Sequence, residues 1–518
     1  MFGLNIIISI ALTLTTIYLT YKCIYSYWKR RNIPFIKPLP LVGNLLDLIL
    51  LKVSFGELFQ QLYEHPTLQN RDYGGIFVLQ QPALIIREPE LIRKLLIKDF
   101  DMFLNRFEAA DQIYDHMGFL TLPLSKYEIW RTCRKKMSEV FTSGKIKYRM
   151  YPLMLKIAQE LESYILRQFE NTLYDIKEMD IEVKEMCSLF TTDLTSVLHY
   201  GVDVKGLKTG HSSLRQQTKE LFKANFKQVL NFLIVFFLPH LTTVLRAKVF
   251  SSCYSKFMRD FTLESYWQRQ KIPEPSLIQG DLLDVLQRFQ NDGSVTDSYS
   301  QHPDFIPSQV AIFLLAGFET SSSVIGFILY ELSKYPEIQQ RLRSELNEAF
   351  SGEKCLSYEK LQELSYLHGV VSEGLRMYPA AAFINRECTP GKDSPQGFYL
   401  KPDLFVPKGM PLYVSILGLH RDPKHWPEPH IFRPERFAPD NLPNIHPMTY
   451  LPFGAGPHGC IGSRLGLLQV KLGLAHILRI CRVQKCTQTP TDIKFDAKSF
   501  MLQAKGGIYL KFIKEQNG

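Results

Sequence analysis

The chain has 518 residues, of which 45% are hydrophobic and 22% charged. This balance is that of an ordinary globular protein and excludes a wholly disordered chain or a membrane protein with many spans. The formal net charge is +10, but no segment concentrates Lys and Arg as a nucleic-acid-binding arm does, so nucleic acid is not an expected partner. The 9 cysteines form no CxxC pairs and indicate neither a disulfide framework nor a zinc module, which favours a reducing compartment.

The N-terminus departs from this soluble pattern. Residues 4–27 are mostly apolar, are long enough to cross a bilayer, and are followed at once by the basic residues 29–31. A cleavable signal peptide would begin with basic residues, whereas no charge precedes Lys22. The sequence therefore predicts a membrane anchor over residues 1–28. Because the basic residues follow the anchor, the body is expected to face the cytosol, which in a eukaryotic cell indicates the endoplasmic reticulum membrane.

The elements that follow the anchor are predicted from turn signals and periodicity. Residues 29–44 are basic and rich in proline, which predicts a semi-rigid linker. Two short apolar runs, 76–79 and 83–86, predict a hairpin, and residues 90–98 have helical spacing. From about residue 145 to 289 the pattern is mainly helical.

The second half of the chain changes character twice. An apolar run at 229–238 is too short to span a bilayer, so it predicts either a core helix or a helix that dips into a membrane surface. Residues 291–304 are polar and predict an exposed loop before a long helix that begins near Ser308. Beyond Pro379 the sequence has short strands, turns and prolines.

The segment Phe453–Gly462, FGAGPHGCIG, carries the strongest chemical signal. Its 4 glycines surround Cys460 just before a helical run at 463–481, and glycine lets a backbone approach a bulky group closely. Backbone N–H groups and the helix dipole are expected to lower the pKa of this cysteine and hold it as a thiolate. A thiolate is a haem ligand that favours O–O cleavage. The alternative is a glycine-rich turn with a structural cysteine.

This segment resembles the haem-binding loop of the cytochromes P450. Two further segments resemble motifs of the same family: the ExxR helix at 373–376 and the PERF segment at 434–437. Nearly the whole chain fits this resemblance, and FTSGK at 141–145 is most similar to insect microsomal enzymes of the detoxification-associated clan. The resemblance implies that Cys460 is the axial ligand of the iron of haem b.

The ExxR and PERF segments predict a structural cluster. Glu373 and Arg376 are three residues apart and therefore share a helix face. Arg436 is expected to complete a buried, hydrogen-bonded trio that fixes the haem loop. An ExxR sequence alone is also common as a solvated surface pair.

The helix around Ala316–Thr320 resembles the oxygen-binding helix of the family. The resemblance implies that Glu319 and Thr320 deliver protons to bound dioxygen. Thr320 is expected to donate its hydroxyl to the carbonyl of Ala316, which loosens the helix and opens a groove, and Gly317 is expected to leave room for a ligand above a flat cofactor. Taken alone, such a threonine is more often structural.

Haem propionates are anions that need cationic or hydrogen-bonding partners in a folded protein. Trp130 and Arg134 are four residues apart, so both are expected to reach one edge of the cofactor from a single helix. The family most often has Arg where this chain has His458, which predicts a weaker propionate contact and pH-sensitive haem retention. The resemblance assigns cofactor binding to Cys460, Trp130, Arg134, Arg106, Arg386, His458 and Phe453.

The predicted fold is mainly α with a smaller β-rich lobe, an α+β protein of the P450 fold with a single N-terminal anchor. Residues 45–518 are expected to form one haem-thiolate monooxygenase domain after the anchor and the linker. An apolar lining is expected from Met117–Leu120, Phe313 and Ala380–Phe383. Such a domain would insert one oxygen atom from O2 into a small hydrophobic substrate, for example a xenobiotic, an insecticide, a hormone or a lipid.

The expected partners follow from the same resemblance. No flavin or nicotinamide segment follows the haem region, so electrons are expected from NADPH through a separate flavoprotein reductase, with cytochrome b5 as a second candidate. A basic group is predicted to steer an acidic partner; it comprises Arg131, Lys135, Lys136, Lys145 and Lys147. Two alternatives remain, a haem-thiolate isomerase or dehydratase that needs no reductase, and a non-catalytic haem- or ligand-binding protein. The Glu319–Thr320 pair argues against the first.

Overall fold

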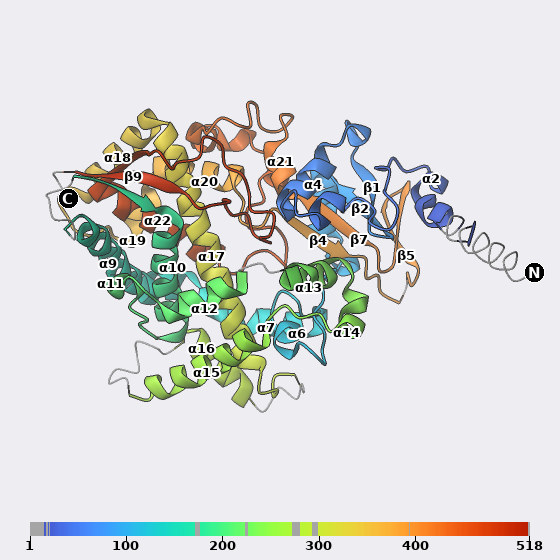
Figure 1. Ribbon diagram of the computed structural model, residues 1–518, viewed down its shortest axis with the longest axis horizontal. Helices are drawn as coiled ribbons and strands as arrows, with labels where there is room; N and C mark the ends of the chain where they lie inside the picture. Colours follow the sequence, from blue (N-terminus) through green and yellow to red (C-terminus); the bar gives the residue numbers. More distant parts are fainter. Residues whose placement is uncertain are drawn as a thin grey trace, which may run out of the picture.

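Helices predominate over strands in the described part of the chain, and three sheets accompany them (Figure 1). The computed structural model describes residues 15–16, 19, 21–170, 177–222, 226–271, 280–292, 299–392 and 394–515. One hydrophobic core lies among the central and C-terminal helices, and a second lies between the N-terminal segment and the largest sheet. This α+β architecture agrees with the prediction.

The helices before residue 293 include two long ones, α9 and α10, that pack on one another. The helices of this part are α2 Tyr27–Arg30, α3 Leu46–Ile49, α4 Phe55–Glu64, α5 Pro89–Arg93, α6 His116–Leu120, α7 Tyr127–Met137, α8 Ser143–Lys145, α9 Tyr151–Glu170, α10 Val183–Tyr200, α11 Gly206–Thr209, α12 Ser213–Phe222, α13 Phe226–Phe237, α14 Thr242–Leu245, α15 Ser252–Arg269 and α16 Leu282–Asn291. Residues 145–289 are therefore mainly helical where they are described, as predicted.

The later helices include the longest one of the chain's described part, α17. They are α17 Phe305–Lys334, α18 Pro336–Phe350, α19 Tyr358–Glu363, α20 Ser365–Met377, α21 Ile416–Arg421 and α22 Ser463–Ile480. Helix α17 is apolar on nearly every face, which is the pattern of a helix enclosed by protein. Both α10 and α22 pack against it. It begins three residues before Ser308, so the predicted long helix is confirmed.

The strands form a main sheet and two smaller ones. The strands are β1 Tyr73–Val78, β2 Gln81–Ile86, β3 Glu178–Glu182, β4 Phe383–Glu387, β5 Gly397–Lys401, β6 Leu404–Pro407, β7 Pro411–Ser415, β8 Cys481–Lys485 and β9 Tyr509–Lys514. The main sheet has the order β1-β2-β7-β4, in which only β2 and β7 run parallel. The other sheets are β3-β9-β8 and β5-β6. The predicted hairpin is therefore confirmed as β1 and β2.

The N-terminal segment is attached to β1. Residues 1–14, 17–18 and 20 of the predicted anchor lie outside the described residues, whereas most of residues 21–30 are helical. Trp28 is fully buried and donates its indole N–H to the carbonyl of Ile76 at 3.0 Å. The predicted linker is also paired with this strand, since the N–H of Ile36 donates to the carbonyl of Gly75 at 3.0 Å. The linker therefore packs on the domain.

The apolar run at 229–238 forms most of α13, and its two faces differ. Val235 and Phe237 are buried, whereas Leu230 is exposed. After a bend of 116° the chain continues through Pro239–Leu245, where Val244 and Leu245 are exposed. One face therefore belongs to the core, and the exposed positions carry both apolar and basic side chains, such as Leu230 and Lys227.

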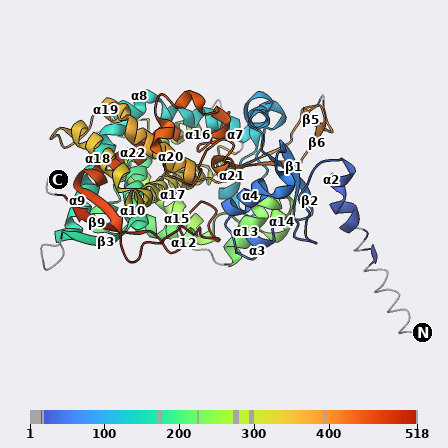
Figure 2. The ribbon, with the colours of Figure 1, turned by 90° about the horizontal axis from the view of Figure 1, so that it is seen from above.

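Among the described residues, α17 is long and apolar enough to cross a membrane, and the bent pair Lys227–Phe237 and Pro239–Leu245 passes the same test together. Helix α17 is covered by other helices on most of its length, as Figures 1 and 2 show. It is therefore a core helix of the domain.

Candidate cofactor-binding and active site

The loop that carries Cys460 is fixed by its own backbone. The N–H of Cys460 donates to the carbonyl of Phe453 at 2.8 Å, and the N–H of Gly459 donates to the carbonyl of Gly456 at 2.9 Å. Gly456 has a φ of 70°, and a Cβ there would lie 1.9 Å from the carbonyl oxygen of Leu96. No other residue fits this contact and this backbone conformation without strain. The loop therefore has one well-defined shape that leads into α22.

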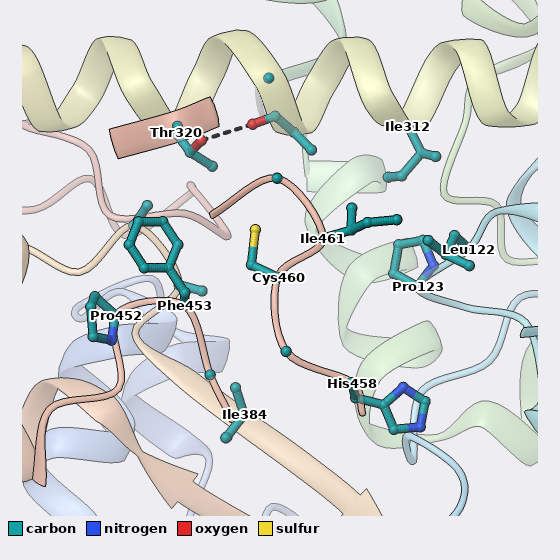
Figure 3. A pocket seen from close by; sticks show the side chains of 18 of the residues that line it. Leu122, Pro123, Ile312, Thr320, Ile384, Pro452, Phe453, His458, Cys460 and Ile461 are labelled. Atoms are coloured by element: carbon teal, nitrogen blue, oxygen red, sulfur yellow. Dashed lines mark hydrogen bonds between the residues drawn. The ribbon is translucent and has the colours of Figure 1, made fainter. Parts of the chain in front are cut away.

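The sulfur of Cys460 projects toward α17 from this loop (Figure 3). A cavity of about 410 Å³ lies against both, and Thr320 of α17 also lines it. Burial raises the pKa of the Cys460 thiol, although the N–H of Gly462 and the charge of Arg134 act in the opposite direction. The predicted lowering by a backbone N–H is therefore present, but burial outweighs it and the net pKa of the thiol is raised. A bound metal cation is what would hold the sulfur as a thiolate here.

The wall of the cavity is mainly apolar. Phe313, Ala380 and Phe383 line it, as predicted, together with Phe236 and Phe500. The segment Met117–Leu120 is not part of the lining, because α6 packs into the core and the following Leu122 and Pro123 reach the cavity instead. Sequence patterns gave no sign of Phe236 or Phe500, which come from distant segments.

Thr320 has the local geometry that the sequence predicts. Its hydroxyl donates to the carbonyl of Ala316 at 2.7 Å (Figure 3). Gly317 serves a different purpose from the predicted one: a Cβ on this residue would lie 2.8 Å from the hydroxyl oxygen of Thr195. Its lack of a side chain therefore lets α10 approach α17 closely, besides bordering the cavity.

Glu319 points away from the cavity. Its carboxylate is almost fully buried, lies 2.7 Å from Nζ of Lys184, and accepts a hydrogen bond from the amide of Gln503. Glu319 is not among the residues that line the cavity, whereas Thr320 is. The two predicted catalytic residues therefore face different surroundings, and a proton relay between them requires a rotation of the Glu319 side chain.

The predicted trio of Glu373, Arg376 and Arg436 is assembled and buried. Arg376 donates through Nε and Nη2 to the two oxygens of Glu373 at 2.7 and 2.8 Å, and Arg436 Nε lies 3.3 Å from the same carboxylate. Arg376 also donates to the carbonyls of His420 and Pro429 at 2.8 and 2.9 Å. Every strong donor and acceptor of this pair is thus used, which a buried ion pair requires.

His420 connects the trio to the cysteine loop. The N–H of Leu451 donates to Nε2 of His420 at 2.8 Å, and Nδ1 lies 3.2 Å from the carbonyl of Arg376. Since Nε2 accepts, Nδ1 carries the proton and donates. Burial and the charge of Arg376 lower the pKa of His420 to about 3, so the ring stays neutral. No sequence pattern indicates this role for His420, because the contact joins segments that only the fold brings together.

Cationic side chains gather at one end of the cavity. All five predicted propionate partners line it: Trp130, Arg134, Arg106, Arg386 and His458. The Trp130 and His458 rings are in contact, with centroids 3.9 Å apart. Arg386 is buried, and its Nε has no hydrogen-bond partner among the described residues. Buried cationic donors without partners fit an anionic ligand, and Phe453 lines the same cavity beside Cys460.

His458 does not contribute a positive charge to this end. Its Nε2 lies 2.8 Å from the carbonyl of Leu104 and therefore donates to it. Burial, together with the charges of Arg106 and Arg386, lowers the pKa of His458 to about 2. The ring is neutral at physiological pH, so this geometry gives no support to pH-sensitive haem retention through His458.

These features agree with a haem site: a cysteine that faces a cavity, a helix with a loosened turn opposite it, and a cationic end for carboxylates. The family model for cytochrome P450 matches residues 33–512. The chain belongs to the cytochrome P450 family. P450s are haem-thiolate monooxygenases, so this protein is an oxidoreductase of that class and its cofactor is haem b.

Similar proteins come from insects. Probable cytochrome P450 6t3 of Drosophila melanogaster is 50% identical over 507 residues, covering 97% of this chain and 98% of the relative. Probable cytochrome P450 6t1 of the same species is 39% identical and covers 97% of this chain and 94% of the relative. Cytochrome P450 6k1 of Blattella germanica is 33% identical, with 98% and 97% covered. The predicted resemblance to insect P450s is thus confirmed.

The buried trio leads to a prediction for Arg376→Met. This change leaves the Glu373 carboxylate without its main partner, and the carbonyls of His420 and Pro429 lose a hydrogen-bond donor. We therefore expect the free energy of unfolding to fall by about 3–5 kcal/mol. The measurement is the urea concentration at which half of the thiolate-ligated haem absorbance is lost. Arg341→Met is the matched control, because Arg341 pairs with Glu435 at the surface and should cost below about 1 kcal/mol. Equal shifts for both variants would contradict the role of the trio.

Proposed function

We propose that this P450 inserts one oxygen atom of O2 into a small apolar substrate, with Cys460 as the iron ligand. The observation that carries the proposal is the position of Cys460 and Thr320 against one mainly apolar cavity. Haem b, when bound, would supply the iron at which dioxygen is reduced. Because the wall is apolar, it excludes water from the cavity. It therefore favours apolar substrates such as xenobiotics, insecticides, hormones or lipids.

The chain's own residues would hold the cofactor from two sides. Arg106, Arg134 and Arg386 would bind the propionate carboxylates, with Trp130 donating from the same end. Cys460 would bind from the loop side, and the Gly456 contact with Leu96 would keep its sulfur at a constant position. These residues would orient the cofactor and would leave the side of the cavity toward α17 for substrate and O2.

Thr320 is the side chain that we propose to hold a water molecule or dioxygen at the face toward α17. Its hydroxyl donates to Ala316, so its oxygen lone pairs remain available to accept a hydrogen bond. Glu319 would take up a proton and pass it on after leaving Lys184. A haem-thiolate isomerase or dehydratase would need no such supply of protons. It would also show no substrate-dependent consumption of NADPH.

Thr320→Ala tests this assignment. Without the hydroxyl, we expect the product formed per NADPH to fall about tenfold, a difference of ~1.4 kcal/mol, with the missing reducing equivalents recovered as hydrogen peroxide. Product, NADPH and peroxide are measured with an apolar ligand found in a spectroscopic binding screen. Thr320→Ser retains the hydroxyl and should behave as the wild type. An unchanged product yield in Thr320→Ala would refute the proposed role.

We also propose that residues 1–28 anchor the protein in the endoplasmic reticulum membrane, with 29–44 as a linker and 45–518 as the cytosolic haem domain. Three exposed apolar side chains of α13 and the turn after it, Leu230, Val244 and Leu245, support contact with a membrane surface. Side chains of α3 and α13 share one hydrophobic core with the helical residues near Trp28. This arrangement would bring the exposed apolar side chains toward the bilayer.

Electrons would come from NADPH through a separate flavoprotein reductase, or in part through cytochrome b5. The basic group predicted for docking is only partly free: Lys136 pairs with Asp292 at 3.5 Å, and Lys147 pairs with Glu359. Arg131 and Lys135 are exposed on α7, the helix that also carries Trp130. Their charges would attract an acidic partner to this side of the domain.

Charge reversal of Arg131 and Lys135 to Glu tests this docking surface. At low salt we expect reductase-supported turnover to slow by about tenfold, because electrostatic steering is lost, and we expect turnover driven by hydrogen peroxide to stay unchanged. Lys256→Glu is the control, since Lys256 is exposed on α15. The docking assignment fails if the double variant matches the wild type at every salt concentration.

A further inference from the structure

The cationic end of the cavity contains a buried carboxylate that the haem-binding motifs do not explain. Glu108 is 7% exposed and lines the cavity. The amide of Asn385 donates to Oε2 of Glu108 at 2.6 Å, and Arg106 Nε lies 4.0 Å from Oε1. Asn385 is itself fixed, because its Oδ1 accepts the N–H of Phe107 at 2.9 Å. The carboxylate is therefore held in one place.

Positive charges outnumber negative ones among the side chains that line the cavity near Glu108. Among the described residues that line the cavity, the guanidinium groups are those of Arg106, Arg134 and Arg386, and Glu108 supplies the carboxylate. Burial and the neighbouring Arg106 lower the pKa of Arg386 to about 9, whereas Glu108 acts in the opposite direction. Buried like charges repel strongly unless anions lie between them.

The haem carries two carboxylates at its edge. Together with Glu108, they match the three guanidinium groups.

We infer that Glu108 is an internal counter-ion that sets the net charge at the propionate end of the haem site. It positions Arg106 and leaves two cationic charges for the two propionates. Glu108 thereby controls both how tightly the haem is held and how easily its iron is reduced. This inference rests on haem binding and is independent of the substrate and of the electron donor.

The direction of the effects follows from electrostatics. The ferric iron carries one more positive charge than the ferrous iron, so a nearby carboxylate favours the ferric form. Removing the negative charge of Glu108 therefore favours reduction. It also leaves an extra cationic charge for the propionates, which should slow haem loss.

Glu108→Gln in the haem-loaded protein is the test, because glutamine keeps an oxygen for Asn385 and removes only the charge. We expect a rise in the midpoint potential of the iron equivalent to about tenfold in the reduction equilibrium, ~59 mV for one electron. We also expect slower transfer of haem to apomyoglobin, with the difference largest at low salt. Glu108→Asp retains the charge and should keep the wild-type potential.

Two further variants separate a charge effect from a structural one. Glu387→Gln makes the same charge change at the next position after Arg386, but Glu387 pairs with Lys126 at 3.4 Å and does not line the cavity, so it should shift the potential little. Arg106→Gln combined with Glu108→Gln restores the charge balance and should return the potential to the wild-type value. The inference is overturned if Glu108→Gln leaves the potential unchanged or lowers it, if this variant does not retain haem, or if Glu387→Gln shifts the potential equally.

Discussion

The position of one sulfur atom is the constraint on which the rest of the structure depends. A thiolate at Cys460 would hold the haem iron and favour O–O cleavage only if its sulfur kept a fixed position. The loop around Cys460 achieves this with a glycine that fits under the carbonyl of Leu96 and with a backbone hydrogen bond to Phe453. The neutral His420 then connects this loop to the buried Arg376. A rigid chain of contacts thus joins the ligand to the core of the domain.

Buried charges have two different functions in this domain. Around Glu373 they are paired and fully hydrogen-bonded within the protein, so this cluster is closed and structural. At the cavity they are left in excess, with a donor of Arg386 unpaired. An excess of buried cations is costly without a ligand. The arginines that line the cavity therefore favour a cofactor that carries carboxylates. Glu108 limits that excess.

Local motifs predicted much of this site. The hairpin, α17, α22, the hydrogen bond of Thr320 and the contacts of Glu373 all follow from residues close together in the sequence or from a recognised motif. The failures concern tertiary surroundings: Glu319 turns toward Lys184, Gly317 accommodates Thr195, and burial outweighs the hydrogen bond that lowers the pKa of Cys460. Glu108 and His420 carried no sequence signal, because their partners lie far along the chain.

The most direct test of this account is the absorption spectrum of the reduced, carbon-monoxide-bound protein. With Cys460 as the thiolate ligand, the wild type should show the strongly red-shifted Soret band of haem-thiolate proteins, and Cys460→Ser should lose that band or bind no haem. Cys481→Ser alters a buried cysteine just after α22 and should retain the band. A red-shifted band that persists in Cys460→Ser, or a wild type that never binds haem, would contradict the account.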